Sequence, residues 1–271
     1  EMVNENHMDY PDFFYEFIPY TEEKLRSKLE GRPIVLVAEH DTIEGFIACY
    51  EDPWCIDIDM LCVKRGPDRT KIEDTLISKV EEEAKGRKVT ITLSSDSRIA
   101  DFENRGYEIY GGFYHLVRSL CNVPAVPSLA EGATLRGMAK GEEETITRIF
   151  YDPDHVGTDV FKPGFTKVWK EDWNHIAELN GKIIAIVCTR PDNKFNANFN
   201  AKRAEIWGPI VLPEYRGKGV EKALECHALH SLREKGMEVA TVWDVEWPPE
   251  PTNFDVSLGF RVKNHWKFLR K

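Results

Sequence analysis

Hydrophobic and polar positions along the chain follow two periods, and this pattern predicts a long series of strands and helices. Short apolar runs bounded by polar residues or glycines are typical of strands. They cover residues 34–38, 45–50, 55–63, 89–93, 107–120 (as one or two strands), 134–138, 175–179, 182–189, 206–212 and 239–245. Apolar residues spaced three and four apart predict helices at 22–30, 70–85, 98–104 and 142–150, and another that begins near 220. The polar stretch 193–200 predicts a loop.

A proline-containing stretch divides this pattern into two similar halves. Residues 122–129 give the strongest linker signal in the chain. When Val63 is placed on Val211, an offset of 148 (211 − 63 = 148), the residues that follow align without gaps. We therefore predict an α/β (α+β) protein with tandem domains at 1–121 and 130–271, each a mixed, mostly antiparallel sheet flanked by helices.

The turn between the strand 206–212 and the next helix carries the strongest functional signal. Pro213 ends the strand, and Arg216-Gly217-Lys218-Gly219 leads into a helical pattern. A strand that turns through glycines into a helix aims backbone N–H groups and a helix N-terminus at one point, which is a geometry that binds phosphate. Glycines let the backbone approach an anion without an intervening Cβ atom.

These residues resemble the acyl-CoA signature of the GNAT N-acetyltransferase superfamily, [Gln/Arg]-x-x-Gly-x-[Gly/Ala]. The resemblance implies that the strand pairs with the pantetheine arm of acetyl-CoA through its backbone, and that the turn amides hold the pyrophosphate. The residues to which it assigns cofactor binding are Val211, Leu212, Arg216, Gly217, Lys218, Gly219, Val220 and Lys222. The last small residue of the signature is Glu221 in this chain, and its negative charge is expected to oppose the pyrophosphate.

The first half lacks the chemistry of this turn. At the same offset, Asp68 replaces Arg216, and Lys71 replaces Gly219. We therefore expect the first domain to be structural, or a wall of the substrate cleft, rather than a second active site.

Acetyl transfer of the type seen in this family requires a deprotonated amine, a stabilised oxyanion and a proton for the leaving thiolate. By resemblance, the backbone amide near Val211 is the oxyanion donor. Glu205, at the head of the strand, is the candidate base, and a solvated strand-end glutamate is the alternative interpretation. Asp244 and Glu246 alternate on the next strand, and either line a cleft for a cationic amine or face solvent.

Two further expectations concern the leaving group and the acceptor. Many relatives carry a tyrosine four residues before a Gly-aromatic pair, and this position is Asp255 here. An ionised aspartate has no proton to give, so we predict that Asp255 is not the general acid and that water, the ammonium or Tyr215 supplies the proton. Aromatic residues either wall the acceptor site or pack a core. They are Tyr151, Phe161, Phe165, Trp169 and Trp173.

Composition and charge limit the partners that we expect. The formal net charge is −10 and no segment is dominated by Lys or Arg, which argues against nucleic-acid binding, and no apolar stretch is long enough to predict a membrane span. The six cysteines stand singly, as expected of reduced thiols in a cytoplasmic protein, and no metal-ligand spacing is present. We predict transfer of an acetyl group from acetyl-CoA to a primary amine on a small molecule or peptide. The alternative is a GNAT-like module that binds CoA or an amine without turnover.

Overall fold

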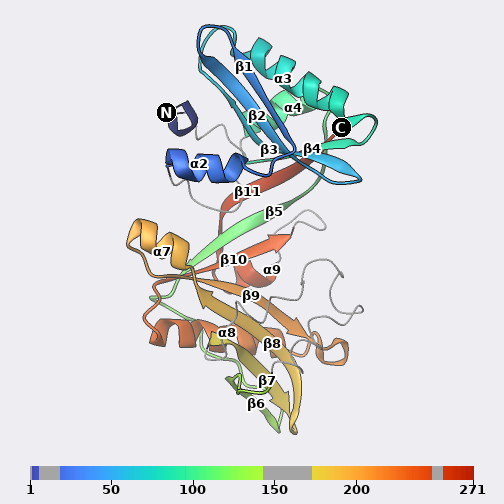
Figure 1. Cartoon of the computed structure of the whole chain (residues 1–271). Helices are drawn as coiled ribbons and strands as arrows, with labels where there is room; N and C mark the ends of the chain where they lie inside the picture. The colour runs from blue at the N-terminus through green and yellow to red at the C-terminus, as the bar shows by residue number, and fades with distance from the viewer. Residues whose placement is uncertain (1, 6–18, 95, 143–172, 246–252) are drawn as a thin grey trace. The chain divides into compact units, whose positions relative to one another are not determined.

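The chain forms two compact units. The computed structural model describes residues 2–5, 19–94, 96–142, 173–245 and 253–271 (Figure 1). The first unit comprises residues 1–114, 245–249 and 264–271, and the second comprises 115–244 and 250–263. The division falls inside β5 (Glu108–Ser119). Residues 107–120 were expected to form one or two strands, and they form one. The role of 122–129 as a domain boundary stays a prediction.

The sheet of the first unit is mixed and mostly antiparallel. Its strands lie in the order β1 (Ile34–Glu39), β2 (Ile43–Glu51), β3 (Cys55–Val63), β4 (Lys88–Leu93) and β11 (Arg261–Arg270). Only β3 and β4 pair in parallel among these neighbours; the other pairs are antiparallel. The C-terminal end of β11 pairs with β4, so residues from the end of the chain complete the first unit.

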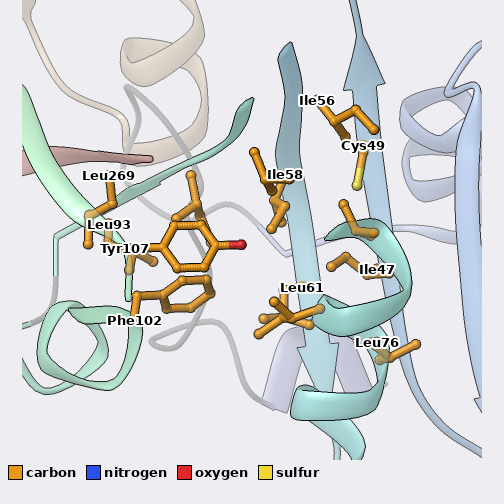
Figure 2. Close-up of a cluster of buried hydrophobic side chains, with 14 of the residues drawn as sticks. Ile47, Cys49, Ile56, Ile58, Leu61, Leu76, Leu93, Phe102, Tyr107 and Leu269 are labelled. Carbon is orange, nitrogen blue, oxygen red and sulfur yellow. The ribbon is translucent and has the colours of Figure 1, made fainter. Parts of the chain in front are cut away.

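Helices cover both faces of this sheet. They are α1 (Met2–Glu5), α2 (Glu22–Leu29), α3 (Arg69–Ala84) and α4 (Asp96–Asn104). Residues of α3 and α4 join one strand face in a buried core that includes Leu76, Phe102 and Tyr107 (Figure 2). The opposite face packs against α1 and α2 through Phe46 and its neighbours. Alternation of inward residues along the strands therefore builds two apolar layers around one sheet.

The second unit repeats this architecture. Its strands lie in the order β10 (Val239–Val245), β9 (Arg203–Val211), β8 (Lys182–Pro191), β7 (His175–Leu179) and β6 (Ala133–Gly137). Again one pair is parallel, β9 with β10, and the others are antiparallel. Helix α8 (Val220–Glu234) packs its apolar stripe against β7, β8 and β9, and the short helix α9 (Asn253–Ser257) follows β10.

The offset found in the sequence is also present in the structure. Strands β3 and β9 each span nine residues and are related by an offset of 148 (203 − 55 = 148). Their parallel pairings stop at equivalent places, at Ile58 with Ile91 in the first unit and at Ile206 with Val242 in the second. In each unit, therefore, two parallel strands stop pairing before they end, and each of the two strands is followed by a helix.

The loop expected at 193–200 is wrong, because Asn193–Phe199 forms helix α7. Asp192 caps the helix by accepting a hydrogen bond from Phe195 N, and Asn200 closes it in the left-handed conformation. The buried guanidinium of Arg203 bonds Asp192 and lies 3.4 Å from the ring centre of Phe195. These tertiary contacts stabilise a segment whose own apolar pattern is too weak to predict a helix. Most of the helix expected at 142–150 lies outside the described residues.

Candidate active site

A cleft opens in the second unit where β9 and β10 part. The two strands pair only from Arg203 with Val239 to Ile206 with Val242, although both continue beyond that point. The cleft has a volume of about 700 Å³, within the range of small-molecule sites. Its lining comprises residues 206–209 of β9, 242–244 of β10, Gly217, Gly219, Glu221 and Lys222 at the start of α8, and Phe254 and Asp255 of α9.

A bulge in β9 forms one wall. The register with β8 pairs Ile186 with Ile210 and then Cys188 with Trp207, so Gly208 and Pro209 stand opposite a single residue of β8. Gly208 has a φ of +99°, and a Cβ there would lie 3.0 Å from Ile210 N. The bulge follows directly after the last residue of β9 that pairs with β10, and Trp207, Gly208 and Pro209 line the cleft.

The glycine turn supplies the other end of the cleft. Gly217 and Gly219 have φ values of +69° and +81°, and a Cβ at either position would meet no atom within 4 Å. Gly219 is the N-cap of α8 and has no side chain to cap the first amides of the helix. The turn is therefore open on the side that lines the cleft, where backbone N–H groups and the helix dipole favour an anion.

The side chain of Glu221 folds back over this turn. Gly217 N donates a hydrogen bond to Glu221 Oε1 at 3.0 Å. The carboxylate thus occupies an amide of the type that a phosphate oxygen would use. The repulsion expected between Glu221 and a pyrophosphate would therefore act at the amide of Gly217.

The structure brings only part of the predicted cofactor set to the cleft. Gly217, Gly219 and Lys222 line it. The other predicted residues, which are not in its described lining, are Val211, Leu212, Arg216, Lys218 and Val220. Arg216 Nε donates to Val211 O at 3.0 Å, and Leu212 N donates to Ile184 O at 2.9 Å, so these groups hold the turn onto the sheet. Their contacts with cofactor stay predictions.

Glu205 lies on β9 but is absent from the described cleft lining. Its side chain is 5% exposed and its Oε2 lies 2.5 Å from Arg190 on β8. Burial raises the pKa of Glu205, although the positive charge of Arg190 acts in the opposite direction. The alternative of a solvated strand-end glutamate does not fit this burial, and the catalytic role stays a prediction.

Acidic and aromatic residues dominate the part of the cleft beside β10 and α9. Trp243 and Asp244 both line it, whereas Glu246 lies outside the described residues. Three acids in the lining, Glu221, Asp244 and Asp255, outnumber Lys222. This surplus favours a cationic ligand group near β10 and α9. Of the five aromatic residues expected near the acceptor, only Trp173 is described, and it is not in the described lining.

Asp255 differs most from what the sequence suggested. It was expected to be hydrated and ionised, yet the residue is only 5% exposed while it lines the cleft. Behind it lies Glu225 of α8, which is 0% exposed. A signal for Glu225 existed in the sequence: it stands between Leu224 and Cys226 and four residues before Leu229, on the buried stripe of the helix.

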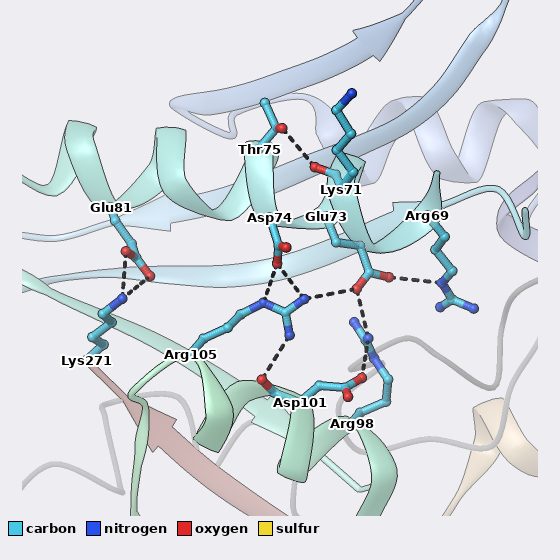
Figure 3. Close-up of polar contacts among 10 residues, drawn as sticks. All are labelled: Arg69, Lys71, Glu73, Asp74, Thr75, Glu81, Arg98, Asp101, Arg105 and Lys271. Carbon is cyan, nitrogen blue, oxygen red and sulfur yellow. Dashed lines mark hydrogen bonds and ion pairs between the residues drawn. The ribbon is translucent and has the colours of Figure 1, made fainter. Parts of the chain in front are cut away.

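The equivalent place in the first unit is filled by charged side chains. A hollow of about 520 Å³ lies between α3 and α4, and Glu73, with a side chain only 4% exposed, lies in its wall (Figure 3). Glu73 Oε1 accepts from Arg69 Nε at 3.0 Å, and Oε2 accepts from Arg98 Nη1 at 2.9 Å. Arg105 Nη2 lies 3.8 Å from Glu73 and 2.7 Å from Asp74.

Within the described ranges, no three His, Cys, Asp or Glu side chains gather as metal ligands. No helix among the described residues is long and apolar enough to span a membrane.

Comparison with known proteins agrees with this fold. Residues 144–248 match the family model of the acetyltransferase (GNAT) family. A GCN5-related N-acetyltransferase from Sphaerobacter thermophilus aligns with a TM-score of 0.70 at 15% identity, over 93% of this chain and 85% of that one.

Two other solved structures share the fold. The glucosamine N-acetyltransferase region of a fungal multi-domain GH3 β-N-acetylglucosaminidase has a TM-score of 0.65 at 16% identity, over 99% of this chain and 37% of that one. A tandem GNAT protein from the clavulanic acid biosynthesis pathway has a TM-score of 0.59 at 16% identity, over 89% and 84%. No curated protein matches the chain in sequence. Residues 144–248 therefore match the GNAT acetyltransferase family, and the chain shares its fold with tandem GNAT proteins.

Proposed function

We propose that the second unit transfers an acetyl group from acetyl-CoA to a primary amine by direct attack on the thioester. The observation that carries the proposal is the cleft between the parted ends of β9 and β10, which begins at an open glycine turn. Except for Phe254 and Asp255, its lining lies within the residues that match the family model. The turn offers amides and a helix N-terminus for the pyrophosphate, and the parted strands offer room for an extended arm.

The same cleft supports a cationic acceptor. Asp244 lies in its lining beside Trp243, and an acidic group next to an aromatic face suits an ammonium or a protonated amine. The amine must lose its proton before attack. Glu205, whose pKa is raised by burial, is the proposed base, acting through water because its carboxylate is paired with Arg190.

The turn provides the sharpest test of cofactor binding. Isothermal titration of CoA into the protein should show one site per chain, because only the second unit keeps the glycines. Release of free thiol from acetyl-CoA should then depend on an added amine, and mass spectrometry should detect the acetylated amine. A panel of polyamines, amino sugars and lysine peptides covers the acceptor chemistry.

Three outcomes separate the candidate functions. Binding with amine-dependent thiol release supports the transferase. Binding without thiol release, for every amine tested, supports the module that binds CoA without turnover. Absence of binding, or two sites of similar affinity, contradicts the assignment of the site to the second unit.

A further inference from the structure

Trp243 lines the cleft, and one face of its indole is covered by a buried histidine. From His115 onward, β5 belongs to the second unit, and it lies next to β10 in the sheet. The imidazole of His115 stacks on the indole of Trp243, with ring centres 4.1 Å apart and planes inclined by 6°. His115 is 1% exposed whereas Trp243 is half-buried, so the stack runs from the interior to the cleft.

Hydrogen bonds fix the orientation of the His115 ring. His115 Nε2 lies 2.5 Å from Thr241 Oγ1, and Thr241 Oγ1 donates to Leu116 O at 3.0 Å. A hydroxyl has one proton to give, so Thr241 Oγ1 accepts from His115, and Nε2 carries a proton. Thr241 is 0% exposed and stands two residues before Trp243, on the same face of β10. The imidazole is therefore anchored at its edge by Thr241 while its face packs on Trp243.

This arrangement presents an indole of fixed orientation in a part of the cleft that is rich in negative charge. The π electrons of an indole make its face attractive to a cation. Asp244, the next residue of β10, also lines the cleft, and with Glu221 and Asp255 it outnumbers Lys222 in the described lining. The surroundings of Trp243 thus favour a positively charged group.

The positive group that Trp243 favours differs from the amine that attacks. The attacking nitrogen is neutral when it meets the thioester, so an attraction for its ammonium form is lost before the transition state. An interaction raises kcat/KM only where it persists in the transition state. A second positive group elsewhere on the acceptor keeps its charge throughout the reaction, and its attraction to the indole persists with it.

We propose that Trp243 binds a second cationic group of the acceptor, which is therefore a diamine or a larger polyamine, and that His115 is the positioning residue that fixes the indole. This inference rests on the proposed acetyl transfer, and it narrows the acceptor from any primary amine to one with another positive charge. Trp243 and His115 act by binding and orientation, and no bond forms or breaks at either residue.

A pair of acceptors tests the second charge. 1,4-Diaminobutane and 1-aminobutane offer the same reacting amine on chains of the same length, but only the diamine carries another positive charge. Wild type should prefer the diamine by about tenfold or more in kcat/KM, and Trp243→Leu should reduce this preference below about threefold by weakening the diamine alone. Equal kcat/KM for the two amines in wild type, or equal losses for both in Trp243→Leu, would overturn the inference.

Two further variants separate the stack from the hydrogen bond. His115→Gln can still donate to Thr241 but has no ring to stack, whereas Thr241→Val keeps the ring and removes the hydroxyl. We expect His115→Gln to lose most of the diamine preference and Thr241→Val to lose part of it. An unchanged preference in His115→Gln would contradict the positioning role of His115.

Thr189→Val is the matched control for Thr241→Val. Thr189, on β8, is also 0% exposed and donates to the carbonyl oxygen of Trp173, but it is not in the described lining of the cleft. Urea unfolding should show similar losses of stability in the two variants, whereas Thr189→Val should keep the wild-type preference for the diamine. Equal losses of preference in both variants would point to a general effect of destabilisation and overturn the role of the His115–Thr241 bond.

Calorimetry with 1,4-diaminobutane, with and without CoA, separates this inference from the proposed function. Diamine binding that Trp243→Leu weakens by about tenfold, together with no release of thiol from acetyl-CoA, supports the cation site and overturns acetyl transfer. Turnover without preference for the diamine overturns the cation site alone. Absence of both diamine binding and turnover overturns both proposals.

Discussion

The two units place a glutamate at the same point of the same strand–helix motif, and they use it in opposite ways. Glu73 and Glu221 are related by the offset of 148 (221 − 73 = 148). Glu73 is buried among three arginines, one of which, Arg69, stands where the second unit has Gly217. Glu221 accepts instead from the backbone amide of Gly217.

The difference shows how one fold becomes either a structural core or a binding cleft. In the first unit, side chains supply both the anion and its cations, so the charges in the hollow between α3 and α4 are already paired within the protein. In the second unit, the glycines leave the cationic part to backbone amides and a helix N-terminus, which an external anion can share with Glu221. The predictions below test this contrast, beginning with the largest effect.

Removing the charge of Glu73 should destabilise the protein strongly. Glu73→Gln leaves Arg69, Arg98 and Arg105 without their buried counter-ion, and breaking a buried ion pair in this way costs about 3 kcal/mol. Urea unfolding should show this loss, whereas the CoA affinity of the folded protein should not change.

Asp74→Asn is the matched control for this substitution. Asp74, the next residue of α3, also pairs with Arg105, but its side chain is 54% exposed, so the loss should be under about 1 kcal/mol. Equal losses in the two variants would mean that burial of Glu73 does not make it special, and the contrast between the units would fail.

Blocking the glycine turn should abolish CoA binding. In Gly219→Arg, a side chain enters the space that an anion would occupy, and we expect affinity to fall at least about a hundredfold. The positive φ of +81° adds strain of about 1 kcal/mol for any side chain.

Gly236→Arg controls for that strain, because Gly236 has the same φ and also meets nothing within 4 Å, but lies at the other end of α8. Gly236→Arg should lower the stability of the protein as much as Gly219→Arg does, but it should bind CoA with the affinity of the wild type. Weakened binding in both variants would point to a general effect on the unit.

The units should also differ in their response to acid. His175 is buried in the second unit against the edge of His227, and burial, more than the charges of His227 and Lys235, lowers the pKa of His175 to about 3. An unfolded histidine titrates near 6.5, so as pH falls the unfolded chain takes up the proton first, and stability is lost between about pH 6.5 and 3, by up to about 1.4 kcal/mol per pH unit.

Urea titrations at pH 7, 6 and 5 should therefore show a falling stability in wild type and a flatter profile in His175→Phe. His40→Gln is the control, since the side chain of His40 is 80% exposed. An unchanged profile in His175→Phe would assign the acid sensitivity to other groups.

Much of this comparison was visible in the sequence, because periodicity and the offset of 148 depend on local residues. The strands 55–63, 175–179 and 239–245 and the helix starting at Val220 were predicted at or near their observed bounds. What escaped prediction depends on contacts between distant segments. Helix α7 needs Arg203, the C-terminal end of β11 joins β4 of the first unit, and Asp255 is shielded by packing.

The cleft itself carried one overlooked signal. A Gly-Pro pair inside an apolar run is a sign of a bulge, because proline cannot donate to a strand ladder and glycine permits a positive φ. Read this way, Gly208-Pro209 would have indicated a cleft along residues 206–209.

Removing the charge of Glu221 should have the smallest effect of these substitutions, and it tests the contrast between Glu221 and Glu73 most directly. Glu221→Gln keeps the side-chain length but no longer repels pyrophosphate, so CoA should bind about fivefold more tightly, a gain of about 1 kcal/mol. Glu221→Gly also frees the Gly217 amide and should bind more tightly still, at a helix cost of about 1 kcal/mol. Both gains should shrink as salt is added, because the turn is exposed to screening. Glu214→Gln is the matched control, since Glu214 lies in the same turn but pairs with Lys182, and it should leave affinity unchanged. If titration calorimetry finds weaker CoA binding in Glu221→Gln, then the carboxylate organises the turn as Glu73 organises the first unit. The two glutamates would then share one structural role.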